Sequence, residues 1–132
     1  MNNDEQKLFP PVPIYVEKYT SFYTRKNPTK LISKFLDELK LPHEFKRVKG
    51  KFTHTGADPV LPPRPIGSQP YPEEWSKGEV TDARIYLYEA DEGILCEFQR
   101  RSGNTVVFNN IYRKIIEKLS KEGVVILPYM AK

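Results

Sequence analysis

The chain has 132 residues, of which 39% are hydrophobic and 12% aromatic; this suffices for one domain with a core and argues against wholesale disorder. One cysteine excludes an internal disulfide, and no apolar run reaches the length of a membrane-spanning helix. The net charge of +4 is unevenly spread, because residues 18–51 hold ten lysines and arginines against three acidic residues, a net +7. Such a concentration attracts anions, although a solvated basic surface explains it equally well.

The first half of the chain predicts a tail, a strand, a helix and a basic strand or hairpin. Residues 1–18 are expected to form a tail or linker, because a polar start is followed by three prolines. Residues 15–23 are rich in aromatic and β-branched side chains and favour a first strand. Asn27 and Pro28 predict the start of a helix over 28–40. Residues 45–55 then predict a basic strand or hairpin.

The second half begins with a proline-rich insertion over 58–78, which holds six of the twelve prolines. Residues 84–89 alternate apolar and polar side chains, and a turn at 91–93 leads into a second alternating run at 94–99 that places Cys96 in the core. A helix is predicted over 105–121 from the helical spacing of Phe108, Ile111, Tyr112, Ile115, Ile116 and Leu119. Residues 124–127 form a short apolar ending.

These elements predict an α+β fold, with two helices packed on one face of a small antiparallel sheet of four to five strands. Residues 19–132 would form the single domain, after the tail of residues 1–18 and with the insertion at 58–78 inside it. The lone cysteine and the absence of a signal-peptide pattern favour an intracellular protein, cytoplasmic or nuclear, with peripheral membrane contact as one option.

Six basic residues are the candidate contacts for a lipid or a partner. Two arginines end the predicted strand beside Gly103, where bidentate guanidinium groups suit phosphate, and four cations lie in the basic hairpin; the set is Lys46, Arg47, Lys49, Lys51, Arg100 and Arg101. Strand alternation is expected to divide the four hairpin residues between two faces. Ordinary solvated charges are the competing interpretation.

The sequence favours a binding domain over an enzyme. It has no nucleophile elbow, no phosphate-cradling loop and no carboxylate pair in an apolar pattern, so no catalytic residue and no cofactor is predicted. His43 and His54 lack companions for a metal site and are expected at the surface. A nucleic-acid-binding sheet is the alternative function, because basic residues are interleaved with Tyr23, Phe52, Tyr86 and Tyr88.

Residues 59–64 also fit the PxxPxR pattern that SH3 domains read in a polyproline II conformation. Pro59, Pro62 and Arg64 occupy its fixed positions. The pattern is short and common, so an SH3 domain is a minor partner hypothesis.

The order of three segments resembles the kinase-associated-1 domain, a module at the C-terminus of several Ser/Thr kinases. Residues 20–24 (TSFYT) before the first helix are similar to the entry strand of checkpoint kinases and of plant kinases regulated by calcineurin-B-like proteins. Residues 97–103 (EFQRRSG) with the following helix resemble the family's late strand, turn and final helix, and residues 124–128 (VVILP) resemble its ending. The resemblance covers roughly residues 19–129, and the insertion is longer than the family's usual turn.

The resemblance implies a regulatory role without chemistry. Such domains restrain their own kinase domain in cis, dock a regulatory subunit, or bind anionic phospholipid, and checkpoint kinases act in the cell cycle. The chain contains no glycine-rich loop, HRD or DFG motif, so a kinase domain would lie outside it.

Overall fold

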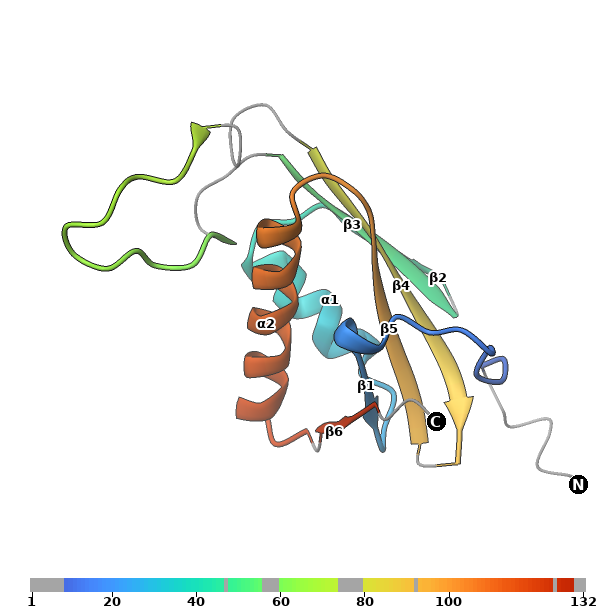
Figure 1. Ribbon diagram of the computed structural model, residues 1–132. Helices are drawn as coiled ribbons and strands as arrows, with labels where there is room; N and C mark the ends of the chain where they lie inside the picture. Colours follow the sequence, from blue (N-terminus) through green and yellow to red (C-terminus); the bar gives the residue numbers. More distant parts are fainter. Residues whose placement is uncertain are drawn as a thin grey trace, which may run out of the picture.

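A computed structural model describes residues 9–46, 48–55, 60–73, 80–91, 93–124 and 126–129. The described elements are the 3-10 helix η2 (Lys18–Thr20), β1 (Ser21–Thr24), α1 (Thr29–Glu38), β2 (His43–Lys46), β3 (Lys49–Thr55), β4 (Val80–Ala90), β5 (Gly93–Ser102), α2 (Thr105–Lys121) and β6 (Ile126–Pro128). The strands form one antiparallel sheet in the order β2-β3-β4-β5-β1-β6. Both helices lie on the same side of it (Figure 1), so the predicted α+β class is confirmed.

The predicted number of strands is wrong, because the described residues form six strands in place of four or five. The basic run at 45–55 is divided by a turn into β2 and β3, which pair in a hairpin. The apolar ending also becomes a strand, since Ile126–Pro128 pairs with β1. The first strand is shorter than expected, because the chain forms η2 before entering the sheet at Ser21.

The helices match their predictions closely and share one core. Helix α2 begins after Asn104, whose side chain accepts a hydrogen bond from the Val107 N–H at 3.1 Å and so caps the first turn. Asn27 plays a similar part before α1, accepting from the Thr29 N–H at 3.0 Å. The buried side chains of the two helices are Ile32, Phe35, Leu36, Val107, Phe108, Ile111, Ile115 and Leu119.

These helical side chains pack on the sheet face formed by alternate residues of the strands. Phe22 of β1, Leu87 of β4 and Cys96 of β5 are opposite one another in the register and are fully or almost fully buried. Phe98 also contacts α2, because its ring lies edge-on to Tyr112 with 5.2 Å between ring centroids. The opposite face of the sheet, pointing away from the helices, is called the open face below.

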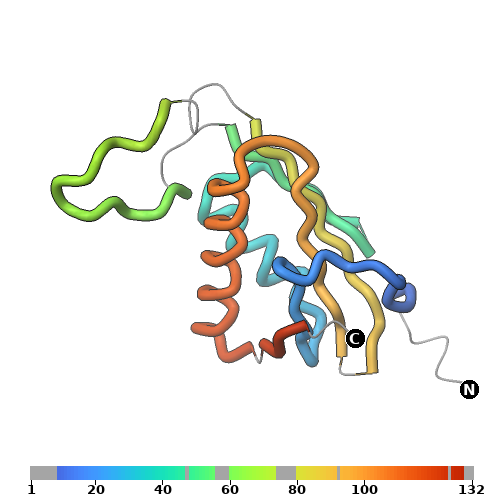
Figure 2. Tube along the Cα trace, viewed as in Figure 1, coloured from blue at the N-terminus to red at the C-terminus, as the bar shows by residue number. Residues whose placement is uncertain are grey.

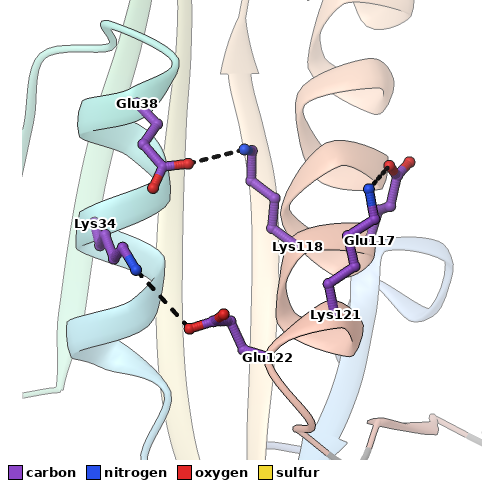
Figure 3. A network of polar contacts seen from close by, with 6 residues as sticks. All are labelled: Lys34, Glu38, Glu117, Lys118, Lys121 and Glu122. Atoms are coloured by element: carbon purple, nitrogen blue, oxygen red, sulfur yellow. Dashed lines mark hydrogen bonds and ion pairs between the residues drawn. The ribbon is translucent and has the colours of Figure 1, made fainter.

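Polar contacts also join the two helices at their solvent side (Figure 3). The Lys118 ammonium donates to Oε1 of Glu38 at 2.9 Å, and Lys34 lies 3.8 Å from Oε1 of Glu122. The hydrogen bond from Lys118 lowers the pKa of the Glu38 carboxyl below its ordinary value. All four side chains are partly exposed, so these pairs adjust the helix packing and contribute little to its stability.

The turn between β5 and α2 depends on a glycine. Gly103 has a φ of +96°, which side chains disfavour, and a Cβ there would collide with the backbone of Thr81. The Asn104 N–H reaches the Thr81 hydroxyl at 3.2 Å. This close approach fixes the end of β5, and with it Arg100 and Arg101, against β4.

The N-terminal segment differs from the predicted tail. Residues 1–8 lie outside the described residues, but residues 9–20, called the N-terminal segment below, pack on the domain. Phe9 and Val16 are each only 8% exposed. The Glu89 N–H donates to the Pro10 carbonyl at 2.6 Å, and Pro11 forms an isolated parallel bridge with Glu89. The domain therefore includes residues that the sequence assigned to a linker.

The proline-rich insertion projects from the body as an extended loop over its described residues 60–73 (Figure 2). One end is anchored, because Val60 is 1% exposed in the core and Leu61 packs against it. The Tyr71 hydroxyl donates to the Pro62 carbonyl, which ties the two sides of the loop together. The base of the insertion is thus held against the domain, whereas Ile66, in the projecting part of the loop, is fully exposed.

Candidate functional site

Basic side chains gather on the open face in the half of the sheet that β2, β3, β4 and β5 form. The register places Lys46 opposite Lys49 and Lys51 opposite Arg84. Directly opposed residues of antiparallel strands point to the same face. Ile85, between Arg84 and Tyr86, is buried on the helix side, so Arg84 and Tyr86 belong to the open face.

The predicted division of the hairpin cations between two faces is wrong for the three that the structure describes. Strand β2 ends at Lys46, and the pairing places Lys49 opposite it. Lys51 follows at the strand period of two and joins the same face. Arg47, the fourth predicted residue, lies outside the described residues.

Arg100 and Arg101 separate into two different roles. The ladder between β4 and β5 shifts register between Asp82 and Ala83, so the two arginines do not simply alternate. The Arg101 Nη2 donates to the Tyr86 hydroxyl at 2.6 Å, which places this guanidinium on the open face. The Arg100 Nη1 instead donates to the Gly103 carbonyl at 3.0 Å and braces the turn.

A shallow hollow of about 540 Å³ lies between these side chains. It is lined by Glu44, Lys46, Lys49, Gly50, Lys51, Arg84, Tyr86 and Arg101. We call the five cations among them, Lys46, Lys49, Lys51, Arg84 and Arg101, the basic cluster. Arg84 was not predicted, although its alternation with buried Ala83 and Ile85 was the signal that could have found it.

The electrostatics of the hollow favour an anion. Five cations stand against one carboxylate, Glu44, and no ion pair within the described ranges engages any of them. Two like-charge pairs, Lys46 with Lys49 and Lys51 with Arg84, face each other directly across strands. Such pairs destabilise a sheet by roughly 0.2–1 kcal/mol each, a cost that an anion placed between them would offset.

The other half of the open face is covered by the N-terminal segment. Glu97 of β5 is 2% exposed there, and its carboxylate accepts from the Glu17 N–H at 2.8 Å and from the Tyr88 hydroxyl at 2.9 Å. Burial raises the pKa of Tyr88, and the hydrogen bond to Glu97 adds to that rise. The Tyr86 and Tyr88 rings stack with 6.3 Å between centroids, which links the covered half to the basic cluster.

The histidines are not surface residues, so that expectation is wrong. The His54 residue is 2% exposed, and the His43 side chain is 12% exposed. His43 Nε2 lies 2.7 Å from the Ser33 hydroxyl, and its Nδ1 lies 3.0 Å from the Leu41 carbonyl and 3.8 Å from Asp37 Oδ1. These contacts join the start of β2 to α1, which contains Ser33 and Asp37.

The lone cysteine has a structural role in the core. Cys96 is fully buried, as predicted, and burial raises the pKa of its thiol, so the reactive thiolate is disfavoured. No group of three or more histidine, cysteine or acidic side chains in the described part of the chain is placed to hold a metal. Likewise no helix among the described residues is long and apolar enough to cross a membrane.

The SH3 pattern is only partly accessible. Pro59 lies outside the described residues, and Val60 and Leu61 are engaged by the core. The Pro62 carbonyl is taken by Tyr71, and the Arg64 guanidinium lies 5.9 Å from the Tyr71 ring centroid. Docking of this segment in an SH3 groove would therefore compete with its contacts to the domain.

No known protein-family model matches this chain, and no curated protein matches it significantly in sequence. The resemblance to kinase-associated-1 domains is therefore supported only by the order of the segments in this sequence. The candidate site is supported only by the geometry of the structure.

Proposed function

We propose that this chain is a non-catalytic docking domain that binds anionic phospholipid through the basic cluster. One observation carries the proposal: four of the five cations form like-charge pairs directly across neighbouring strands, and none lies within ion-pair distance of a carboxylate among the described residues, although Glu44 is opposite Lys51 in the register. Directly opposed like charges destabilise a sheet. A bound anion removes the repulsion.

The shape of the site favours a surface of many phosphates over one small anion. The hollow is shallow, and its cations extend over β2, β3, β4 and β5. A basic residue near an anionic membrane contributes about 1 kcal/mol, so five give roughly 5 kcal/mol before desolvation and ordering costs. The resulting association is weak and is reduced by salt.

The resemblance to kinase-associated-1 domains supports a regulatory role for this docking in a Ser/Thr kinase. In that role the domain restrains the kinase domain in cis, and membrane binding competes with the restraint. A kinase that carries this chain should gain basal activity when residues 19–132 are deleted. Unchanged or lower activity, with the kinase domain still folded, would support a purely targeting role.

Vesicle co-sedimentation tests the lipid proposal. The variant Lys49→Gln/Lys51→Gln/Arg101→Gln removes three cations of the basic cluster, and Lys30→Gln/Arg113→Gln/Lys114→Gln removes three from the helices. The wild type and the helix variant should co-sediment with vesicles that contain phosphatidylserine, whereas the cluster variant should not. Equal co-sedimentation of both variants would show that the basic cluster does not bind the lipid.

Single-stranded RNA, run in parallel at matched salt, separates this function from the nucleic-acid alternative. That alternative draws on Tyr86, which is half-buried on the open face beside the basic cluster. Tighter binding to RNA than to anionic vesicles would move the function to nucleic-acid binding.

A further inference from the structure

A second concave site lies on the open face, at the end of the sheet away from the basic cluster. It is a groove of about 950 Å³ between the N-terminal segment, the end of β4, β1 and β6. None of its lining residues is shared with the hollow of the basic cluster. We call it the tyrosine groove, after four of its lining residues, Tyr15, Tyr19, Tyr23 and Tyr129.

The tyrosine groove exposes aromatic and apolar surface. Of five exposed large apolar or aromatic side chains in the described ranges, three line it: Ile14, Tyr15 at 88% and Tyr19 at 79% exposed. On the side of the groove that β1 and the chain after β6 form, the centroids of the Tyr23 and Tyr129 rings lie 5.8 Å apart. A concentration of exposed aromatic surface in a groove is typical of an interaction site.

The charge of the groove is the reverse of that of the basic cluster. Its wall contains three carboxylates, Glu17, Glu89 and Asp91, against one cation, Lys18. No ion pair within the described part of the chain engages any of these carboxylates. Acidic groups beside exposed tyrosine rings favour a cationic ligand, because the ring faces and the carboxylates both attract positive charge.

The groove already holds one contact of this kind. The Lys18 Nζ lies 5.1 Å from the centroid of the Tyr19 ring, within the range of a cation–π interaction. An incoming lysine or arginine would compete with Lys18 for this ring. Lys18 is therefore an internal competitor for the site.

We propose that the tyrosine groove binds a peptide segment of a partner protein that carries lysine or arginine side chains. Charge complementarity identifies the occupant, since the groove is locally acidic in a protein whose net charge is +4. A basic peptide that binds must find a local acidic surface, and the groove supplies three carboxylates together with exposed rings. The proposal is independent of lipid binding at the basic cluster.

The test is fluorescence anisotropy of a labelled octapeptide in which arginine and lysine alternate with glycine. Saturable binding to the wild type is expected, and Glu89→Gln/Asp91→Asn should weaken it about fivefold or more. The control Glu73→Gln/Glu117→Gln removes two carboxylates outside the groove and should change the affinity less than about twofold. Both pairs alter the net charge equally, so their difference isolates the groove.

Two further variants test the aromatic part. Tyr15→Ala/Tyr19→Ala should weaken binding about threefold or more, and these exposed rings can be removed without disturbing the core. Lys18→Gln should strengthen binding, because it frees the Tyr19 ring and removes a positive charge. No saturable binding by the wild type, an equal loss in the groove and control variants, or tighter binding of a glutamate version of the peptide would each overturn the proposal.

Discussion

The Glu17 backbone N–H donates a 2.8 Å hydrogen bond to Oε2 of Glu97, a residue eighty positions later in the chain. This contact fastens the N-terminal segment to the middle of the sheet. The Glu97 carboxylate is almost fully buried, and it remains tolerable there because the Tyr88 hydroxyl donates to its other oxygen at 2.9 Å. One acidic side chain thus joins the covering segment, β4 and β5.

Replacing Glu97 by glutamine should destabilise the fold. The side-chain amide can accept from the Glu17 N–H and donate to the Tyr88 oxygen, but both contacts then lose the carboxylate charge that strengthens them. We expect the free energy of unfolding in urea to fall by about 1–3 kcal/mol. Glu73→Gln, at an exposed glutamate, is the control and should leave it unchanged. An unaltered stability of Glu97→Gln would mean that the carboxylate is not needed to hold the segment.

The packing of the N-terminal segment predicts a sharp contrast between neighbouring positions. Phe9→Ala/Val16→Ala removes two side chains that are each 8% exposed, and should lower the free energy of unfolding by about 2–5 kcal/mol. Ile14→Ala, in the same segment but fully exposed, should have almost no effect. A tail would be indifferent to all three changes, so equal stability of both variants would restore the tail interpretation.

The helices were predictable because their apolar spacing is local information, and Asn27-Pro28 marked where α1 begins within one residue. The N-terminal segment was not, because Phe9 and Val16 stand apart among prolines and show no periodicity. Only β5 indicates that a covering segment is required, because its Leu95 and Glu97 are buried on the face opposite Cys96 and Phe98. A strand buried on both sides requires a second cover, and the sequence does not say which segment supplies it.

The basic cluster shows the same limit. The sequence identified Lys46, Lys49, Lys51 and Arg101 as candidates, but their convergence depends on where the hairpin turns. A shift of one residue would send Lys49 and Lys51 to the helix face. Arg84 joins them only through the β3–β4 register, across an insertion of more than twenty residues. Pairing over that distance cannot be inferred from local patterns.

The like-charge pairs predict that removing a cation can stabilise the sheet. Lys49 faces Lys46 on one side and Tyr86 on the other, so Lys49→Thr should raise the free energy of unfolding by about 0.2–1 kcal/mol. Lys51→Thr is the matched control, because it gains the same strand propensity but removes both a repulsion, from Arg84 on β4, and an attraction, from Glu44 on β2. Urea titration should show the larger gain for Lys49→Thr. A larger gain for Lys51→Thr would contradict repulsion between Lys46 and Lys49.

The two arginines at the end of β5 should differ in lipid binding. Arg101 lies on the open face with the basic cluster, so Arg101→Gln should weaken association with phosphatidylserine vesicles. Arg100 is bonded to the Gly103 carbonyl, so Arg100→Gln should leave vesicle binding nearly unchanged and instead lower stability by about 0.5–1.5 kcal/mol. Equal losses of vesicle binding would show that both guanidinium groups reach the lipid.

The pair of Glu38 with Lys118 predicts a dependence of stability on pH (Figure 3). The Lys118 hydrogen bond lowers the pKa of Glu38 in the folded chain below its ordinary value of 4.5. A carboxyl with a lowered folded pKa stabilises the fold above its unfolded pKa, and this contribution disappears as the pH falls through the folded pKa. Unfolding in urea should therefore show wild type more stable than Glu38→Gln at neutral pH, with the difference vanishing in acid. The control Glu73→Gln should show no such convergence, and a constant difference at every pH would mean that Lys118 does not sense the charge of Glu38.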